Sequence, residues 1–319
     1  MPDNASSAPD YAAAARELAT VVDFARWLTT VFARSDLHYG HGTVDPWDEA
    51  LALIAGALRL PWDRLERLFP ARLTDAERRV MVALARRRIE ERVPVPYLTG
   101  RAWFAGVEFS VDQRVLIPRS PIAEMILVGF EPWLQAPPKR ILDLCTGSGA
   151  IGIACALAFL EAEVLLADIS ADALAVAKAN VDRYQLDPRV MVRLGDLFVA
   201  SEGRFDLIVS NPPYVPSSSY AQLPAEYGHE PALALVADDE GVAIVERILC
   251  EAADHLTEQG VLILEVGEIE PAVVQRLGDA TVAWPEFRRG GEGVLVADAT
   301  TLRAYAAKRA AAGGRPRGN

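Results

Sequence analysis

The sequence predicts an α/β protein in which a mostly parallel sheet follows a helical region. Three observations predict this fold. Short apolar runs that end at polar residues recur after residue 140, as buried parallel strands do. A glycine-rich turn joins the first of these runs to an apolar helical segment. Before residue 93, apolar residues recur at spacings of three and four, which is the period of an α-helix.

Residues 1–93 are predicted to form an N-terminal helical domain for substrate recognition. Its apolar spacing is clearest at Leu18, Val21, Val22, Ala25 and Leu28. Pro94 and Pro96 end this region, because proline cannot continue a helix. Residues 94–116 are predicted to be a β-hairpin linker, since glycines punctuate alternating apolar residues there.

Residues 117–300 are predicted to be the α/β domain that carries the chemistry. Its expected strands are 141–144, 163–168, 190–194, 205–209, 260–266, 281–284 and 293–298. Residues 301–319 are expected to be a flexible tail, because the end of the chain is basic and rich in small residues.

The turn after the first strand is a candidate binding site for an adenosine-containing cofactor. It reads Asp143-Leu144-Cys145-Thr146-Gly147-Ser148-Gly149, and with Gly152 it also matches the dinucleotide pattern G-x-G-x-x-G. The second strand ends at Asp168, whose carboxylate can accept two hydrogen bonds from a ribose diol. These features fit a nicotinamide dinucleotide as well as S-adenosylmethionine.

Three further features favour S-adenosylmethionine. Asp143 lies inside the strand, where a carboxylate suits a cationic amino-acid tail better than a pyrophosphate. Asp196 and Leu197 follow the third strand and offer an acid and an apolar residue to an adenine. The fourth strand leads into Asn211-Pro212-Pro213-Tyr214, for which a dehydrogenase has no use.

This Asn-Pro-Pro-Tyr segment suits chemistry on a planar amide or amine nitrogen. The Asn211 side-chain oxygen and the Pro212 carbonyl can accept both hydrogens of an –NH₂ group, while Tyr214 fixes its plane. The plain alternative is a proline-rich turn that ends a strand. We therefore predict Asn211, Pro212 and Tyr214 as catalytic residues.

These motifs resemble the class I methyltransferases that methylate a glutamine side-chain amide, the HemK/PrmC/PrmB family. The resemblance extends upstream through Pro96–Gly100, Phe104 and Val115–Arg119, and covers roughly Leu37 to Asp298. It implies a Rossmann-like, seven-stranded sheet and S-adenosylmethionine as the methyl donor, with S-adenosylhomocysteine as product. The predicted cofactor-binding residues are Asp143, Thr146, Gly147, Ser148, Gly149, Asp168, Asp196, Leu197 and Asn211. The predicted substrate-binding residues are Asn211, Pro212, Pro213, Tyr214, Phe104 and Arg119.

Two segments resemble the PrmB-type branch, which modifies ribosomal protein L-three. They are Tyr39–Ala50 and Pro118–Glu124, where this chain has Ser-Pro-Ile-Ala-Glu after Arg119. The release-factor enzymes of the family usually carry Pro-Glu-Thr-Glu at that place. The resemblance therefore implies L-three as the protein substrate. The alternatives are a release-factor glutamine or, less in keeping with the sequence, an adenine amine of a nucleic acid.

Charge and composition narrow the choice of partners. Residues 1–115 hold 15 basic and 16 acidic side chains, whereas residues 116–319 hold 17 and 28, which together give the net charge of −12. No basic face is evident, so we expect no stable nucleic-acid binding, although a basic ribosomal protein would be attracted. No apolar run reaches membrane-spanning length, and three cysteines make no disulfide framework. We therefore expect a cytoplasmic enzyme that contacts no membrane and needs no metal.

Overall fold

The computed structural model of the chain describes residues 9–288 and 290–313, which separate into two compact units. The first unit contains the chain up to Ala102 together with Pro224–His229. The second contains Trp103–Leu223 and the chain from Glu230 onward. The segment 224–229 is therefore remote in sequence from the rest of its unit.

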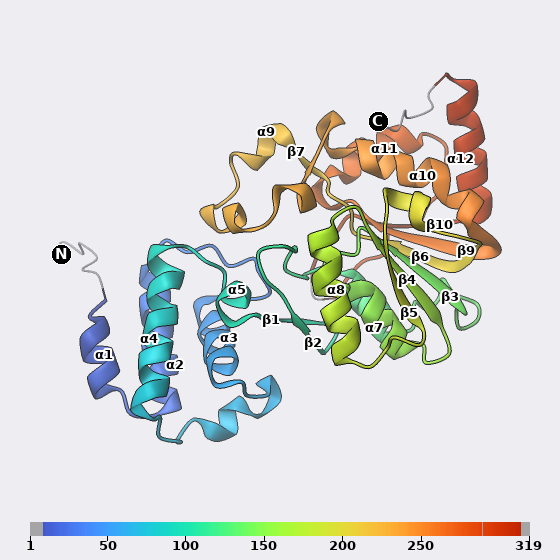
Figure 1. Cartoon of the computed structure of the whole chain (residues 1–319). Helices are drawn as coiled ribbons and strands as arrows, with labels where there is room; N and C mark the ends of the chain where they lie inside the picture. The colour runs from blue at the N-terminus through green and yellow to red at the C-terminus, as the bar shows by residue number, and fades with distance from the viewer. Residues whose placement is uncertain (1–8, 289, 314–319) are drawn as a thin grey trace. The chain divides into compact units, whose positions relative to one another are not determined.

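The first unit is helical (Figure 1). Its elements are α1 (Tyr11–Glu17), α2 (Val21–Arg34), α3 (Pro46–Leu58), η1 (Trp62–Leu68), α4 (Asp75–Glu90), α5 (Val95–Thr99) and η3 (Ala225–His229). Side chains that accept backbone N–H groups fix where the helices begin. Thr20 and Asp23 form a capping box on α2, and Asp45 caps α3 directly before a proline.

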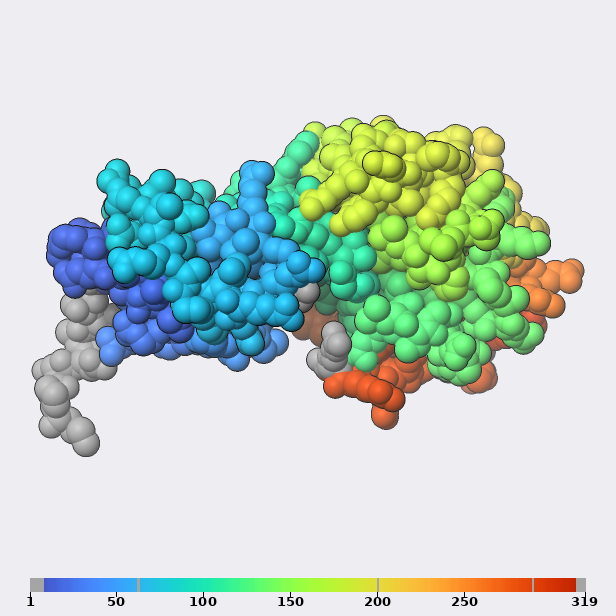
Figure 2. Space-filling model, turned by 90° about the horizontal axis from the view of Figure 1, so that it is seen from below, coloured from blue at the N-terminus to red at the C-terminus, as the bar shows by residue number. Residues whose placement is uncertain are grey.

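The core of the first unit forms where α2 packs against α3. Phe24, Leu28 and Phe32 repeat at spacings of four and are fully buried with Leu53 and Ile54. Figure 2 shows the outer surface of these helices, coloured from blue to cyan. The structure therefore confirms that this region is helical, and its buried residues follow the spacing on which the prediction was based.

A buried ion-pair network holds the segment 224–229 in the first unit. Arg88 on α4 is 1% exposed, and its Nε donates to Glu49 Oε1 at 2.6 Å. Its Nη1 donates to Glu226 Oε1 at 3.0 Å, and its Nη2 donates to the His38 carbonyl at 2.8 Å. Both carboxylates are also buried, so each needs charge compensation: Arg88 supplies it to Glu49, whereas Glu226 also pairs with Arg92 Nη1 at 3.4 Å.

The second unit is built on a six-stranded sheet of order β10-β9-β6-β3-β4-β5. Its strands are β3 (Arg140–Leu144), β4 (Glu163–Asp168), β5 (Val190–Leu194), β6 (Phe205–Ser210), β9 (Leu256–Glu265) and β10 (Val294–Asp298). All neighbours pair in parallel except β10, which runs antiparallel to β9. A separate two-stranded sheet, β1 (Arg101–Phe104) with β2 (Val107–Ser110), forms within the predicted linker.

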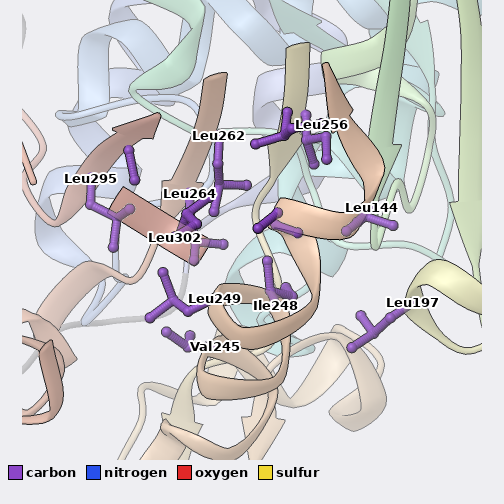
Figure 3. Close-up of a cluster of buried hydrophobic side chains, with 14 of the residues drawn as sticks. Leu144, Leu197, Val245, Ile248, Leu249, Leu256, Leu262, Leu264, Leu295 and Leu302 are labelled. Carbon is purple, nitrogen blue, oxygen red and sulfur yellow. The ribbon is translucent and has the colours of Figure 1, made fainter. Parts of the chain in front are cut away.

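Helices cover both faces of this sheet (Figure 1). One face carries α7 (Ala150–Ala158) and α8 (Ala171–Arg183), and the other carries α10 (Ala243–His255), α11 (Glu270–Leu277) and α12 (Ala299–Ala311). Alternate side chains of a strand point to opposite faces. Leu142 and Leu144 therefore join the apolar cluster on α10, in which Figure 3 labels Leu144. Asp143 between them lies against Gly152 of α7.

Short elements connect the sheet to its helices. They are α6 (Ile122–Leu127), η2 (Leu197–Ala200), β7 (Val215–Pro216), α9 (Ser217–Tyr220), η4 (Ala232–Ala234), β8 (Val236–Ala237), η5 (Asp239–Gly241) and η6 (Gly267–Ile269). Strand β7 directly follows the Asn-Pro-Pro-Tyr segment and pairs in parallel with β8. Among the residues that the structure describes, no helix is long and apolar enough to cross a membrane.

Two expectations about the end of the chain are corrected. No strand forms at 281–284, where one was expected. Only Ala283 in that run pairs, in a single antiparallel bridge with Val296. The flexible tail expected at 301–319 is wrong for residues 301–311, which belong to α12. Leu302 and Tyr305 bury on one face of that helix, and Asp298 caps its first turn. Residues 314–319 lie outside the described residues.

We predict that replacing Arg88 with methionine lowers the free energy of unfolding of the first unit by about 3 to 5 kcal/mol. The change leaves Glu49 buried without its counter-ion and leaves Glu226 with only its longer pair to Arg92 among the described residues. Urea unfolding followed by circular dichroism measures the loss. The matched control is Arg87→Met on the same helix, because Arg87 pairs with Glu91 at an exposed site and its loss costs less than about 1 kcal/mol. Equal losses in the two variants would contradict a structural role for the buried pair.

Candidate active site

The predicted site residues follow the carboxyl ends of four neighbouring strands. The glycine-rich turn follows β3, Asp168 ends β4, Asp196 follows β5 and Asn211 follows β6. The register places Leu144 of β3 beside both Ala167 and Ser210. Because the strands are parallel, residues far apart in sequence meet at one edge of the sheet, where open α/β folds bind ligands.

A cavity of about 490 Å³ opens in the second unit at this edge. Ten predicted site residues line it: Phe104, Arg119, Thr146, Gly147, Ser148, Asp168, Asp196, Leu197, Asn211 and Pro213. Four others do not belong to its lining. Asp143 and Gly149 lie within the strand and turn behind it, and Pro212 and Tyr214 belong to the segment that passes it.

Asp143 holds the glycine-rich turn in shape. Its Oδ2 accepts from Thr146 Oγ1 at 2.5 Å and from the Gly152 N–H at 2.8 Å. A Cβ at Gly152 would come within 2.2 Å of Leu166 and 3.0 Å of Asp143, so only glycine fits there. Burial raises the pKa of Asp143 to about 7, although both hydrogen bonds lower it. Its Oδ1 is buried and has no hydrogen-bond partner among the described residues.

Asp168 joins the turn to the end of β4. Its Oδ2 accepts from the Gly147 N–H at 2.9 Å, and its Oδ1 accepts from the Ser170 N–H at 2.9 Å. The Ile169 backbone also bonds to this carboxylate, which still has acceptor capacity left, and the side chain lines the cavity. Burial raises the pKa of Asp168. The carboxylate is therefore fixed in place and can still accept from a bound hydroxyl.

Asp196 is held by a residue that the sequence analysis did not identify. Arg247 on α10 donates from Nη1 to Asp196 Oδ1 at 3.1 Å and from Nη2 to Oδ2 at 2.8 Å. This two-pronged geometry fixes the plane of the carboxylate. Arg247 also lines the cavity, so the polar group at this end is an ion pair and not a lone acid.

The Asn-Pro-Pro-Tyr segment is fixed at both ends. Before it, Ser210 Oγ donates to the Leu144 carbonyl at 2.8 Å and so joins the ends of β6 and β3. At its other end, the Tyr214 hydroxyl donates to Glu265 Oε1 at 3.1 Å. Pro212 and Pro213 are buried, whereas Asn211 is partly exposed and lines the cavity.

Arg119 and Phe104 complete the predicted set. Arg119 donates from Nη1 and Nη2 to the two oxygens of Glu230, at 2.7 Å each. Glu230 is buried and also accepts the Ile117 N–H at 3.0 Å, so it orients the segment before Arg119. Phe104 is buried and packs edge-on against Phe109, with ring centres 6.5 Å apart.

Sequence reasoning missed Arg247, Glu265 and Ser120 as parts of this site, and it assigned no role to Glu230. Ser120 lines the cavity and donates to Glu265 Oε2. Glu265 carried a usable indication, because it is a carboxylate that directly follows the apolar run 261–264 at the end of a strand. Arg247 carried none, since charged residues are ordinary on the surface of a helix.

The arrangement fits an S-adenosylmethionine-type cofactor on features of the structure itself. The buried, unpartnered Asp143 Oδ1 is an acceptor that a cationic amino-acid group would satisfy. Asp168 offers free lone pairs for a diol, and Asp196 and Leu197 line the same cavity. Among residues 9–288 and 290–313, no cluster of histidine, cysteine and acidic side chains could hold a metal ion.

Comparison with known proteins places the chain among methyltransferases. The sequence model of the methyltransferase small domain matches residues 130–223. A ribosomal protein uL3 glutamine methyltransferase of Xanthomonas campestris is 46% identical over 299 residues, which cover 93% of this chain and 97% of that protein. A protein of the same description from Francisella tularensis is 44% identical over 282 residues, or 88% and 90% of the two chains.

The chain belongs to the ribosomal protein uL3 glutamine methyltransferase family. It is therefore a methyltransferase, and the predicted class I methyltransferase fold and family are confirmed. An S-adenosylmethionine-type cofactor follows from this enzyme class. A solved methyltransferase from Pyrococcus furiosus is 22% identical, with a TM-score of 0.44, over 60% of this chain and 88% of that one.

We predict that the affinity for S-adenosylhomocysteine falls by about tenfold per pH unit below pH 7. The pKa of Asp143 is raised to about 7, so its carboxylate is charged above that pH and neutral below it, and we expect only the charged form to attract the ligand's ammonium group. Calorimetric titration between pH 5.5 and 8.5 measures the effect. In Asp143→Asn the affinity should be weaker and lose this pH dependence. If the affinity of the wild-type protein did not change with pH, Asp143 would stabilise the turn and take no part in binding the ligand.

Proposed function

We propose that this enzyme transfers a methyl group from S-adenosylmethionine to the side-chain amide nitrogen of a glutamine in ribosomal protein uL3. One observation carries the proposal: Asn211 lines the same cavity as Asp168 and the glycine-rich turn. An amide-binding side chain therefore borders the site that suits the methyl donor. The family supports the substrate, because two curated relatives are named for it.

Residues of this chain would hold the donor along the strand ends. Asp168 would accept from the ribose hydroxyls, and Asp196 and Leu197 would border the adenine. Asp143 and the turn that it shapes would face the amino-acid part. When bound, S-adenosylmethionine supplies a sulfonium-activated methyl group, so the protein has no need to activate the donor.

The chemical difficulty lies in the amide, whose nitrogen lone pair is delocalised into the carbonyl. Asn211 Oδ1 and the Pro212 carbonyl would accept the two N–H bonds and point the nitrogen at the methyl group. Alignment of this kind contributes up to roughly 7–11 kcal/mol in the best intramolecular cases. The same acceptors stabilise the positive charge that develops on the nitrogen. The methylated, cationic amide is acidic and loses its proton to water.

Tyr214 would flank the amide and fix its plane, and Phe104, Pro213 and Arg119 would border the substrate. The cavity lining supports the last three, because each faces the same space as Asn211. The ion pair with Glu230 neutralises Arg119, so this arginine would position the substrate by shape and hydrogen bonding more than by charge. The net charge of −12 favours a basic protein substrate over a nucleic acid.

We predict that Asn211→Ala lowers the turnover number by about 10² to 10³, the usual cost of removing one group that stabilises developing charge. Affinity for S-adenosylhomocysteine should stay within about threefold of wild type, since the other lining residues remain. Transfer of labelled methyl groups and calorimetry measure the two quantities. Gln222→Ala is the matched control, because this exposed amide donates to the nearby Ser218 carbonyl and, among the described residues, to no part of the cavity. Near-normal turnover of Asn211→Ala would refute the amide-binding role.

We predict that free uL3 is methylated at a glutamine faster than a release factor, and that DNA is not methylated. Labelled S-adenosylmethionine is incubated with each substrate in parallel, and mass spectrometry locates the modified residue. The assay uses free uL3, because assembly into the ribosome buries much of a ribosomal protein. Faster methylation of the release factor than of uL3 would identify the release factor as the substrate. Labelled methyl groups in DNA would show instead that the enzyme methylates an adenine amine.

A further inference from the structure

Glu265 is a buried carboxyl group at the end of β9, beside the Asn-Pro-Pro-Tyr segment. It is 6% exposed and follows an uninterrupted apolar run within the central sheet. A buried carboxylate is costly unless donors compensate it, so its partners explain its presence. Burial raises the pKa of Glu265, and the hydrogen bonds from Ser120 and Tyr214 lower it only in part.

Its two oxygens hold two parts of the site. Oε1 accepts from the Tyr214 hydroxyl at 3.1 Å, and Oε2 accepts from Ser120 Oγ. Ser120 lines the cavity and follows Arg119, whereas Glu265 and Tyr214 do not belong to the lining, which includes Pro213 next to Tyr214. The carboxylate therefore stands behind the site and connects its wall to the tyrosine of the motif, without reaching the space where a substrate would bind.

The backbone around Glu265 leaves the Tyr214 ring little freedom. A Cβ at Gly267 would lie 2.6 Å from Tyr214 Cε2 and 2.9 Å from its hydroxyl, and Gly267 has a φ of +51°. A Cβ at Gly241 would lie 2.1 Å from the Tyr214 carbonyl. Gly293 in turn packs on Gly267 and accepts its N–H at 3.1 Å. Three glycines thus let the backbone close around the tyrosine, and Glu265 fixes its free end.

We propose that Glu265 is a positioning residue that sets the orientation of the Tyr214 ring for methyl transfer. This inference rests on the proposed function, in which Tyr214 flanks the substrate amide. Packing alone confines a ring, but a hydrogen bond at its hydroxyl also selects one tilt. Glu265 acts through Tyr214 and accepts no proton from the substrate. A neutral acceptor at the same place therefore serves equally well.

A double-mutant cycle tests this role. Glu265→Leu removes the acceptor and should lower kcat at least tenfold, while KM and the affinity for S-adenosylhomocysteine stay within threefold. Glu265→Gln keeps a carbonyl oxygen for the hydroxyl and should retain kcat within threefold. In a Tyr214→Phe background, which has no hydroxyl to hold, Glu265→Leu should have no further effect. An equal loss in both backgrounds, or a Glu265→Gln variant as slow as Glu265→Leu, would overturn the proposal.

Further variants separate the proposal from simpler causes. Glu268→Gln removes an exposed charge three residues away and should leave kcat unchanged. If the Glu265→Leu variant does not bind S-adenosylhomocysteine, the double-mutant cycle is repeated with Ser120→Ala in its place. Its smaller loss of kcat should vanish in the Tyr214→Phe background, and persistence of that loss would overturn the proposal. The cycle is run on whichever glutamine substrate the wild-type enzyme methylates. The result for Glu265 can therefore be interpreted even if uL3 is not the substrate.

Discussion

The geometry of the site depends on one buried carboxylate, that of Asp143. It lies inside the central strand of the sheet, where a charge is tolerated only because Thr146 and the Gly152 N–H donate to it. These two bonds tie the strand to the turn and to the first turn of α7. The turn then presents the Gly147 N–H to Asp168, which fixes the end of the next strand. Removing the carboxylate would therefore disturb two strand ends at once.

The ends of strands β3 and β6 are also joined by a side-chain hydrogen bond. Ser210 Oγ donates to the carbonyl of Leu144, which directly precedes the glycine-rich turn. One hydrogen bond thus connects the half of the site that suits the cofactor to the segment that begins at Asn211. Methyl transfer needs the two reacting groups at a fixed separation, and errors of about 1 Å are costly. Hydrogen bonds between adjacent strand ends fix this separation better than long loops would.

The sequence predicted those parts of the site that lie next to strand ends. Apolar runs located the strands, and parallel pairing then required Asp168, Asp196 and Asn211 to meet. It did not predict the pairs Arg247–Asp196 and Glu265–Tyr214, whose members lie 51 residues apart and meet only through packing. The C-terminal helix was missed because its small residues give a weak pattern, with few large side chains buried. The expected seventh strand failed because only Ala283 finds a partner.

The loop after Tyr214 shows how the two units share one stretch of chain. Glu226 belongs to the first unit and is paired with Arg88, whereas Glu230, four residues later, belongs to the second and is paired with Arg119. Both carboxylates are buried, so releasing either one leaves an uncompensated charge. The loop is thus anchored separately at each end, and its conformation requires both units to be folded. The segment after Asn211 is therefore linked in sequence, through Glu226, to the buried ion pairs of the helical unit.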